Sequence, residues 1–330
     1  MRRWLACLLW GAGIICPAAW AQTSAGPQGA LQLLQKVAVA TQKLDYSGTF
    51  VYRRGNQSET SRIVHVSSNG NRLQRLEVLD GSPREVIRRN DAVECYLPDE
   101  RLVIVEQRSA QRAFPALLPA SLANLAEHYQ IRMQGEVRIA GIDSRMIRLD
   151  AKDAWRHGHL FWVDTASGLL LRADVLDERG QSLESMAFTE LRIGTPEKQV
   201  SMKSSHAETG AIKDSWTVRQ AKLSELRDDG NWVFRADLPG FRRQAAMRRS
   251  IARDHLAMQE VLHWVYSDGL AAFSVFISPN SQAAGVSEGI EVMGAISVMK
   301  RAVEGHEVVV MGDLPPAAIR RFAEGIGRNK

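Results

Sequence analysis

Cysteine and long apolar runs are both scarce in this 330-residue chain. Beyond the first 21 residues only Cys95 remains, so an exported mature chain cannot form an intramolecular disulfide. Beyond the same point no apolar run approaches the ~20 residues that a membrane-spanning helix needs. Glycine-rich phosphate loops are also missing. The chain must therefore fold by hydrophobic burial, and roughly 300 mature residues suffice for two domains of ordinary size.

The first 21 residues have the three parts of a secretory signal. Met1–Arg3 is the basic start, Trp4–Ile15 the apolar core, and Ala19–Ala21 the small-residue cleavage site. Cys16 offers a lipoprotein alternative, but the bulky Ile15 precedes it where lipid-attachment signals have a small residue. Soluble export is therefore preferred.

The charge of the chain argues against a nucleic-acid binder. The 42 Lys and Arg residues include two in the signal, which leaves 40 basic against 37 acidic residues and a net charge of +3. This is mild basicity and not the footprint of nucleic-acid recognition. An exported protein is also separated from the nucleic acid of the cell, which disfavours nucleic acid as a partner.

One segment matches a catalytic pattern. Gly285–Gly289 has the spacing of a nucleophile elbow around Ser287, but it follows the polar loop Pro279–Gln282 where the motif needs a buried strand. A flexible loop is the alternative interpretation, and we expect no catalytic residue here. A secreted hydrolase, which would lose its activity on Ser287→Ala, is kept as a third functional class.

His157 and His159 flank Gly158, an arrangement that puts two imidazoles on one face of a strand and suits a metal. No Cys, Asp or Glu trio at ligand spacing completes the site. Two exposed histidines at the start of a strand are preferred, and neither a metal nor another cofactor is expected. For Cys95, which has no basic neighbour in sequence to lower its pKa, buried packing is preferred over nucleophilic use.

A predicted β-hairpin at Asp45–Val66 organises the first domain. Two β-prone runs flank the turn signal Arg54–Asn56. Alternation along the first run places Tyr46, Phe50 and Tyr52 on one face. An aromatic sheet face either packs against a second layer or forms the wall of a ligand groove. Ordinary core packing and groove lining both remain open for these three side chains.

The rest of residues 22–193 has the pattern of a long antiparallel sheet with few helices. Apolar positions in Ala30–Leu44 recur at helical spacing, and Ala116–Tyr129 predicts a second helix with Ser121 as its N-cap. Turn signals about every ten residues separate short strand-like runs. The runs after the hairpin are 72–79, 84–88, 92–97, 101–105, 132–139, 145–150, 159–163, 169–176 and 183–191. We expect a curved sheet with helices on its concave side.

Residues 194–228 lose the apolar rhythm and are expected to link the first domain to a second one at 229–330. In the second domain, strand-like runs at 231–236, 262–266, 270–277, 296–303 and 306–311 precede a closing helix that begins at Pro315 and Pro316. Ile319, Phe322 and Ala323, followed by Ile326, form its apolar stripe. This domain is predicted to be a small α+β unit.

Four arginines gather at the head of the second domain. Arg242 and Arg243 lie close in sequence to Arg248 and Arg249. A solvated charged face and a site for an anion or an acidic partner are about equally favoured. Guanidinium groups suit the bidentate capture of carboxylates or phosphates.

Several segments resemble the RseB/MucB family of periplasmic negative regulators of the sigma-E (AlgU-type) envelope-stress factor. They are Asp45–Tyr52, Phe161–Arg172, Met247–Ser250, Tyr266–Ile277 and Met311–Pro315. Each motif is modest alone, but their order and the two-domain layout make the resemblance fairly specific, and it covers nearly the whole mature chain.

The resemblance implies an α+β fold: a large domain shaped like an unclosed β-barrel with covering helices, similar to lipoprotein carriers, and a smaller C-terminal domain. It implies binding to the periplasmic segment of a membrane anti-sigma factor of RseA/MucA type, protection of that segment from regulated proteolysis, and release by lipid or lipopolysaccharide. An open sheet lined by Tyr46, Phe50, Tyr52 and Trp162 would hold an acyl chain, with each buried CH₂ contributing ~0.8 kcal/mol before ordering costs.

The leading hypothesis is thus a non-enzymatic periplasmic regulator. The alternative is a periplasmic lipid or lipoprotein carrier that uses the same groove, although a pure carrier has no obvious need for the second domain. Arg248 and Arg249 are expected to contribute to binding the partner or a lipid phosphate. The oligomeric state stays open, with a homo-oligomer as one outcome.

Overall fold

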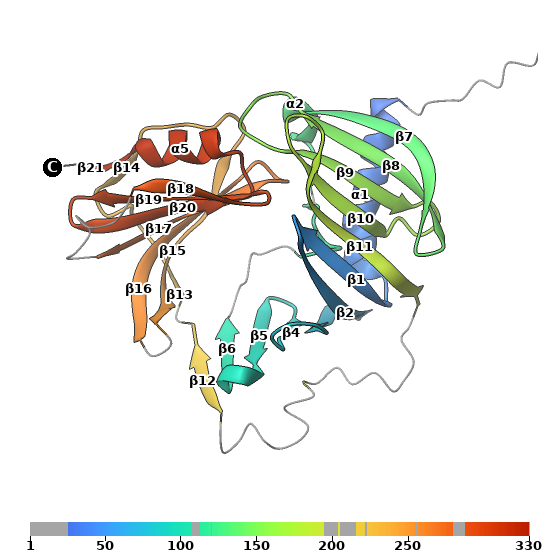
Figure 1. The fold of residues 1–330 in the computed structure, drawn as a ribbon, viewed down its shortest axis with the longest axis horizontal. Helices are drawn as coiled ribbons and strands as arrows, with labels where there is room; N and C mark the ends of the chain where they lie inside the picture. Colours follow the sequence, from blue (N-terminus) through green and yellow to red (C-terminus); the bar gives the residue numbers. More distant parts are fainter. Residues whose placement is uncertain are drawn as a thin grey trace, which may run out of the picture.

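The computed structural model of the chain describes residues 26–106, 113–119, 121–194, 204, 216–221, 223–254, 257–279 and 288–329. Within these ranges the chain forms two large sheets, each packed on its own hydrophobic core (Figure 1). The predicted signal, residues 1–21, lies outside the described residues. No helix in the described ranges is long and apolar enough to cross a membrane. The predicted fold class, mainly antiparallel β with an unclosed barrel and a small α+β C-terminal domain, is confirmed.

The N-terminal domain is built on a twelve-stranded sheet in the order β12-β6-β5-β4-β3-β2-β1-β11-β10-β9-β8-β7. Its neighbours pair antiparallel except β12 and β6, which are parallel. Within the described residues β7 and β12 are its two edges, so the sheet stays open. The strands are β1 (Tyr46–Arg54), β2 (Gln57–Ser68), β3 (Asn71–Val78), β4 (Glu85–Arg89), β5 (Ala92–Leu97), β6 (Leu102–Glu106), β7 (Tyr129–Ile139), β8 (Ile142–Ala151), β9 (Gly158–Asp164), β10 (Leu170–Leu176), β11 (Ser182–Ile193) and β12 (Thr217–Gln220).

The predicted hairpin is confirmed and lies in the middle of this sheet. β1 and β2 meet at the turn of Gly55 and Asn56, and Gly55 has a φ of 55°. β1 pairs with β11 on its other side, with a bulge opposite Thr49 and Phe50. The two halves of the domain sequence thus join at β1, because β11 comes some 130 residues later in the chain.

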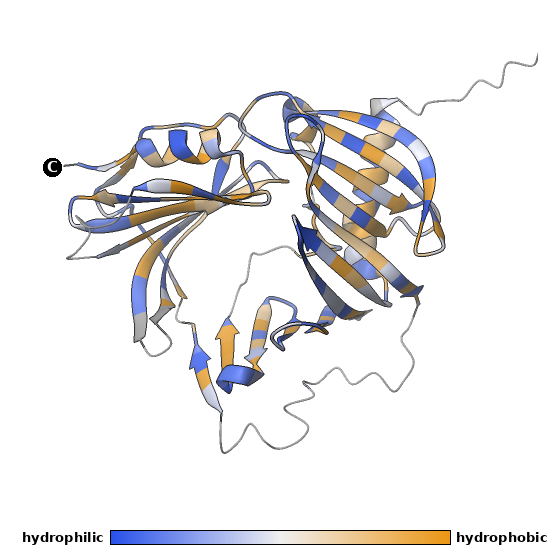
Figure 2. Cartoon of the chain, viewed as in Figure 1, coloured by the Kyte–Doolittle hydropathy of each residue, from blue (hydrophilic) through white to orange (hydrophobic). Residues whose placement is uncertain are grey.

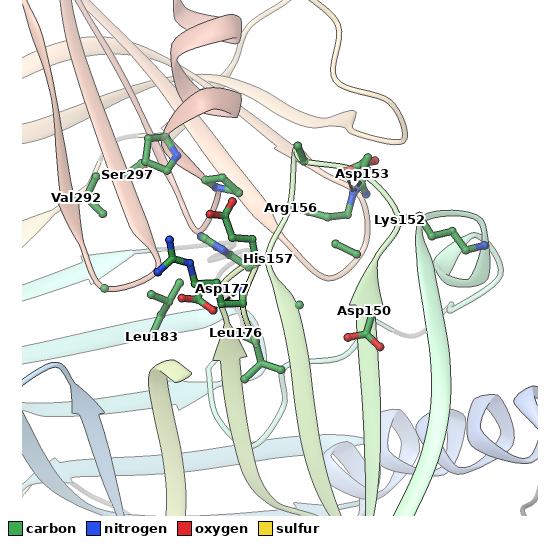
Figure 3. A pocket seen from close by; sticks show the side chains of 18 of the residues that line it. Asp150, Lys152, Asp153, Arg156, His157, Leu176, Asp177, Leu183, Val292 and Ser297 are labelled. Atoms are coloured by element: carbon green, nitrogen blue, oxygen red, sulfur yellow. Dashed lines mark hydrogen bonds and ion pairs between the residues drawn. The ribbon is translucent and has the colours of Figure 1, made fainter. Parts of the chain in front are cut away.

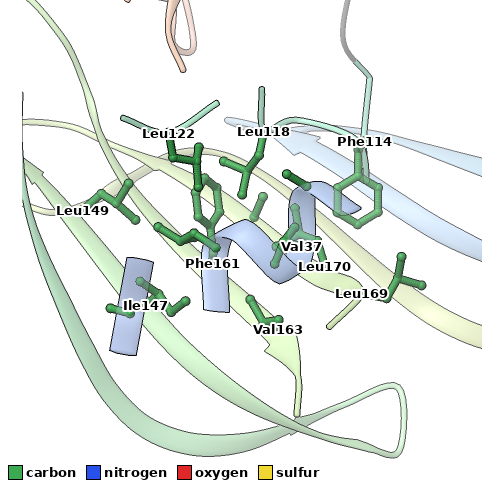
Figure 4. Close-up of a cluster of buried hydrophobic side chains, with 14 of the residues drawn as sticks. Val37, Phe114, Leu118, Leu122, Ile147, Leu149, Phe161, Val163, Leu169 and Leu170 are labelled. Atoms are coloured by element: carbon green, nitrogen blue, oxygen red, sulfur yellow. The ribbon is translucent and has the colours of Figure 1, made fainter. Parts of the chain in front are cut away.

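The core of this domain lies between the sheet and the helix α1 (Pro27–Lys43), which extends the predicted helix toward the N-terminus. Figure 4 shows Val37 of α1 among side chains of the sheet, including Ile147, Phe161 and Val163. Leu34 and Val37 of the helix are completely buried. Side chains alternate along the strands between this core and the other face, as the hydropathy colouring in Figure 2 shows.

The predicted helix over Ala116–Tyr129 is largely wrong. Helical structure is confined to α2 (Leu125–His128), with Asn124 at the N-cap position where Ser121 was expected. Two leucines of this segment, Leu122 and Leu125, are nevertheless buried in the core. The described part of this segment packs apolar side chains on the core, although most of its backbone is irregular. The spacing of its apolar residues therefore predicted their burial correctly but predicted the helix wrongly.

The C-terminal domain is built on a seven-stranded sheet in the order β13-β15-β16-β17-β20-β19-β18. The helix α5 (Pro316–Glu324) covers one face, and its predicted stripe of Ile319, Phe322 and Ala323 is buried there, whereas Ile326 begins a strand. The strands are β13 (Leu223–Glu225), β15 (Arg242–Asp254), β16 (Ala257–Ser267), β17 (Ala272–Pro279), β18 (Gly289–Met293), β19 (Ile296–Val303) and β20 (His306–Gly312), with β14 (Trp232–Phe234) paired separately to β21 (Ile326–Arg328).

The stretch at 194–228, which was expected to link the domains, contributes a strand to each sheet where the structure describes it. β12 pairs with β6 of the N-terminal sheet, and β13 pairs with β15 of the C-terminal sheet. Ser204, also in this stretch, is buried and donates from Oγ to Glu85. Residues 195–203 and 205–215 lie outside the described residues.

We predict that Gly48→Ala lowers the free energy of unfolding by about 1–3 kcal/mol, because a Cβ at this position would lie 2.3 Å from the carbonyl oxygen of Glu190 on the neighbouring strand. Gly289→Ala is the matched control, since its Cβ would meet no atom within 4 Å. Chemical denaturation measures both, and equal stability of the two variants would contradict the packing argument.

Candidate partner-binding site at the junction of the domains

A buried ion pair joins the two domains. Arg156 lies in the loop between β8 and β9, Asp268 lies in the turn between β16 and β17, and both side chains are fully buried. Nη1 of Arg156 donates to Oδ2 of Asp268, and Nη2 donates to the carbonyl oxygen of Pro239. Nε donates to Oδ1 of Asp153, in the same loop, at 3.0 Å. The guanidinium is therefore held by a carboxylate from each domain.

The surroundings satisfy both charges of this junction pair. Oδ1 of Asp268 accepts hydrogen bonds from the backbone N–H groups of Leu270 and Ala271, each at 2.8 Å. Oδ2 also accepts from the hydroxyl of Tyr129, on the N-terminal domain, at 3.1 Å. The rings of Tyr129 and Phe241 flank the guanidinium, with their centroids 5.7 and 4.9 Å from its carbon. A buried ion pair is stable only with such complete pairing.

Burial and the neighbouring charges fix the protonation states here. Burial raises the pKa of Tyr129 well above its usual range, and the charge of Asp268 adds to this effect. Burial acts to lower the pKa of Arg156, but its hydrogen bond to Asp153 and the charge of Asp268 outweigh that effect and raise it. The phenol thus stays a donor and the guanidinium stays charged near neutral pH.

A second contact lies at the turn between β18 and β19. The backbone N–H of Ala295 donates to Oε1 of Glu184, on β11, at 3.0 Å, and Nε2 of His157 lies 3.2 Å from the carbonyl oxygen of Ala295. Gly294 has a φ of 62°, and a Cβ there would lie 2.6 Å from Glu184 Oε1 and from Arg54 Cγ. Only glycine therefore allows this close approach of the two domains.

A cavity of about 650 Å³ lies beside these contacts, open between the domains (Figure 3). The β8–β9 loop, the β10–β11 turn and the β18–β19 turn line it. Charges of both signs, including Arg148, Asp150, Asp177 and Arg179, are present. Because the lining carries charges of both signs, we do not expect the cavity to bind a simple ion selectively. Such a lining can contact the hydrogen-bond donors and acceptors of a polypeptide.

The four residues expected to line a lipid groove lie in three different environments. Tyr46 and Phe50 are buried in the core beneath α1. Tyr52 is half-buried at the domain junction, where burial and the charge of Glu184 raise its pKa to about 12. Trp162 lies on the face of the sheet opposite its core neighbours Phe161 and Val163, with the Arg172 guanidinium 4.4 Å from its ring. The four side chains do not share one wall, because strand alternation separates Trp162 from the others.

The four arginines do not form one basic patch either. They lie on β15, where Arg243 pairs with Asp229 at 2.6 Å and Arg248 pairs with Glu260 at 2.7 Å. Arg249 points to the opposite face from Arg248 and approaches Glu106 of the N-terminal domain at 3.4 Å. Arg242 is exposed. Their proximity along the chain is visible in the sequence, but the strand that places alternate side chains on opposite faces was not predicted.

The histidines expected to be exposed are buried. His157 faces the backbone of Ala295, and His159 lies between the rings of Tyr129 and Phe161. Among the residues that the structure describes, no group of three or more His, Cys, Asp or Glu is arranged to hold a metal. Cys95 is half-buried, and burial raises its pKa. Ser287 lies outside the described residues.

Sequence reasoning missed the junction pair. The sequence analysis predicted no role for Asp268 or for Arg156. The two are 112 positions apart, so no spacing rule relates them. The only local signal is the large side chain of Trp155 beside Arg156, which is unusual for a simple surface turn.

Both domains of the chain match a known protein family. The family description "MucB/RseB N-terminal domain" matches residues 29–209, and "MucB/RseB C-terminal domain" matches residues 227–327. The chain belongs to the MucB/RseB family. The resemblance predicted from the sequence is thereby confirmed.

Named MucB and RseB proteins match over almost their full length. The chain is 30% identical over 300 residues to the sigma factor AlgU regulatory protein MucB of Pseudomonas aeruginosa, with 89% of each chain covered. It is 28% identical over 310 residues to the sigma-E factor regulatory protein RseB of Salmonella typhimurium, covering 93% of this chain and 92% of that one. Both of these relatives are named as regulators of sigma factors.

Two solved structures share the fold and include a partner. MucB in complex with the periplasmic part of MucA matches with a TM-score of 0.68 at 28% identity, covering 91% of this chain and 99% of that one. The MucA/MucB complex of Pseudomonas aeruginosa matches with a TM-score of 0.70 at 27% identity, covering 92% and 99%. The two-domain MucB/RseB architecture is therefore one that has been observed with a bound partner.

We predict that the junction pair is strongly coupled. Arg156→Met and Asp268→Asn should each destabilise the protein by about 3–5 kcal/mol, because each leaves a buried charge without its partner. The double variant should lose clearly less free energy of unfolding than the sum of the losses in the two single variants. Denaturant titration of all four proteins gives the cycle, and additivity within about 0.5 kcal/mol would contradict the coupling.

We also predict that His159 makes the protein less stable in mild acid. Burial, aided by the charge of His157, lowers the pKa of His159 from 6.5 to about 3 in the folded state. Its contribution is therefore fully present above about pH 6.5 and is lost as the pH falls toward 3, because only the unfolded chain takes up the proton. From pH 7 to pH 5 the loss should be on the order of 1–2 kcal/mol.

His159→Leu removes this titration while keeping an apolar side chain between the two aromatic rings. Thermal or denaturant unfolding at both pH values should show a smaller loss of stability on acidification for the variant than for the natural protein. The same loss in both proteins would show that His159 does not carry the effect.

Proposed function

We propose that this protein is a periplasmic, non-enzymatic regulator that binds the periplasmic segment of a membrane anti-sigma factor of the MucA/RseA type. The observation that carries this proposal is the match of both domains, over nearly the full chain, to MucB bound to the periplasmic part of MucA. The secretory features of residues 1–21 support a periplasmic location.

The chemistry of the junction supports binding over catalysis. Arg156, Asp268 and Tyr129 lie together in the pattern of an active site, but their hydrogen-bonding groups are directed at one another. A catalytic acid or base must be within reach of a substrate. These buried groups instead hold the two domains in a fixed relative position. A protein whose binding surface is built from both domains needs such a fixed arrangement.

The binding surface of such a partner needs roughly 800 Å² on each side. The cavity between the domains, with its mixed charge, supplies polar contacts for part of that area. Bound in this region, the anti-sigma segment would be shielded from the protease that makes the first regulatory cut, because a protease must bind its substrate in an extended and accessible form.

Release by lipid, the second half of the proposal, requires a change in the N-terminal core. Phe50 packs against Phe114 and Phe188, with ring centroids 5.1 and 6.0 Å away, so an acyl chain must displace side chains of the protein itself. A lipid would thus bind an opened arrangement better than the closed one, which is the condition for a ligand-driven shift. No observation here favours a lipoprotein carrier over this coupled role.

We predict that the purified protein binds the purified periplasmic segment of its anti-sigma factor with a Kd of about 1 μM or tighter. Isothermal titration calorimetry measures the affinity, and an unrelated periplasmic domain is the control. Absence of binding by the folded protein would overturn the proposed function. If binding occurs, an added lipopolysaccharide fragment should weaken it, and unchanged affinity would remove the lipid-release part alone.

A further inference from the structure

A groove of about 750 Å³ lies where the β8–β9 loop of the N-terminal domain meets α5 of the C-terminal domain. Trp155 lines it from the loop, and α5 and the segment after β14 form the rest of its wall. It is distinct from the cavity of mixed charge in Figure 3. The charged residues of its wall are Arg235, Arg320, Arg321 and Glu324. We call this site the arginine groove.

The three guanidinium groups of the arginine groove form no ion pair with any residue that the structure describes. Other arginines near the junction and on β15 each pair with a carboxylate: Arg156, Arg243, Arg248 and Arg249. On the groove wall guanidinium groups outnumber carboxylates three to one. Like charges gathered in one groove repel each other, and an anion bound between them removes that repulsion.

Local contacts hold the charged side chains at the groove. α5 exposes Arg320, Arg321 and Glu324 on the side opposite its buried stripe. Nε of Arg321 donates to the carbonyl oxygen of Asp237 at 3.3 Å, and the guanidinium lies 5.2 Å from the centre of the Trp155 ring. A planar guanidinium that is already held in place loses little entropy on binding, and its fork matches the oxygens of a phosphate or a carboxylate.

Trp155 connects the arginine groove to the junction pair. Its side chain packs against the C-terminal core, and the next residue in the chain is Arg156. Asp153 holds both residues, because its Oδ1 accepts from the backbone N–H of Trp155 and from Nε of Arg156, each at 3.0 Å. The loop conformation that brings Trp155 to Arg321 therefore also places Arg156 beside Asp268. A ligand that fills the groove binds the joined domains better than separated ones.

We propose that the arginine groove binds a small molecule with two or more anionic groups, phosphates or carboxylates, and that this ligand stabilises the joined arrangement of the domains. A single anionic group would leave charge unbalanced, because guanidinium groups line the groove from both α5 and the segment after β14. The inference goes beyond the proposed function, since it needs neither the anti-sigma segment nor an acyl chain. The ligand acts in the opposite sense to a lipid that opens the N-terminal core.

Titration calorimetry of the full-length protein with inorganic pyrophosphate and with citrate, at constant ionic strength, tests the site. We expect saturable binding of at least one probe. Arg235→Gln/Arg320→Gln should weaken that binding at least tenfold, and circular dichroism should show the variant folded because both side chains are exposed. The matched control is Arg62→Gln/Arg138→Gln, which removes the same charge from exposed arginines of the N-terminal sheet and should bind as the natural protein does.

The two probes distinguish the sources of the anionic groups. Binding of pyrophosphate alone would identify phosphate as the ligand chemistry, binding of citrate alone would identify carboxylate, and binding of both would show that the groove recognises either oxyanion. Absence of saturable binding of both probes, or equal affinities of the groove variant and the control variant, would overturn the proposal.

Hydrogen exchange with and without a saturating probe tests the effect on the domains. Amide exchange should slow in residues 152–157 of the N-terminal domain as well as in residues 316–324 of α5. Protection confined to 316–324 would show that the ligand contacts one domain alone, and it would overturn the stabilising role. Both experiments omit the anti-sigma segment, so their failure leaves the proposed function standing.

Discussion

The arrangement of the two domains depends on one buried ion pair, Arg156 with Asp268. Each sheet has its own core, so neither domain needs the other in order to bury its apolar side chains. Their relative position is fixed chiefly by a guanidinium that reaches Asp268 and the backbone of Pro239 across the junction, aided by the contact between Glu184 and the backbone of Ala295. A buried pair adds little net stability but strongly disfavours arrangements that separate its charges. The pair therefore determines how the two domains are placed more than it raises the free energy of unfolding.

The two domains also approach each other at a second pair of opposite charges. Arg249 of the C-terminal sheet approaches Glu106 of the N-terminal sheet at 3.4 Å. A surface near this contact is built from both domains. The Tyr129 hydroxyl of the N-terminal domain, which donates to Asp268, is a further link between the two domains.

Local pattern predicted most of the fold. The hairpin at Tyr46, the opening helix and the stripe of α5 follow from periodicity and turn chemistry within a few residues. The sequence did not predict β15, because its run of arginines hides the alternation, nor the burial of His159, which depends on rings from β7 and β9. The junction pair lay beyond sequence reasoning because its members meet only after both domains have folded. Trp162 was grouped with the aromatic side chains of the hairpin without its strand register, which alternation along β9 sets so that it faces away from Phe161 and Val163.

The most direct test of the account is the affinity of the Arg156→Met variant for the anti-sigma segment, measured under conditions where circular dichroism shows both domains folded. If the junction pair sets the surface that the partner recognises, the variant should bind at least tenfold more weakly than the natural protein, although the Arg156 side chain is fully buried. Unchanged affinity in the folded variant would show that the partner recognises one domain alone, and the central claim would be contradicted.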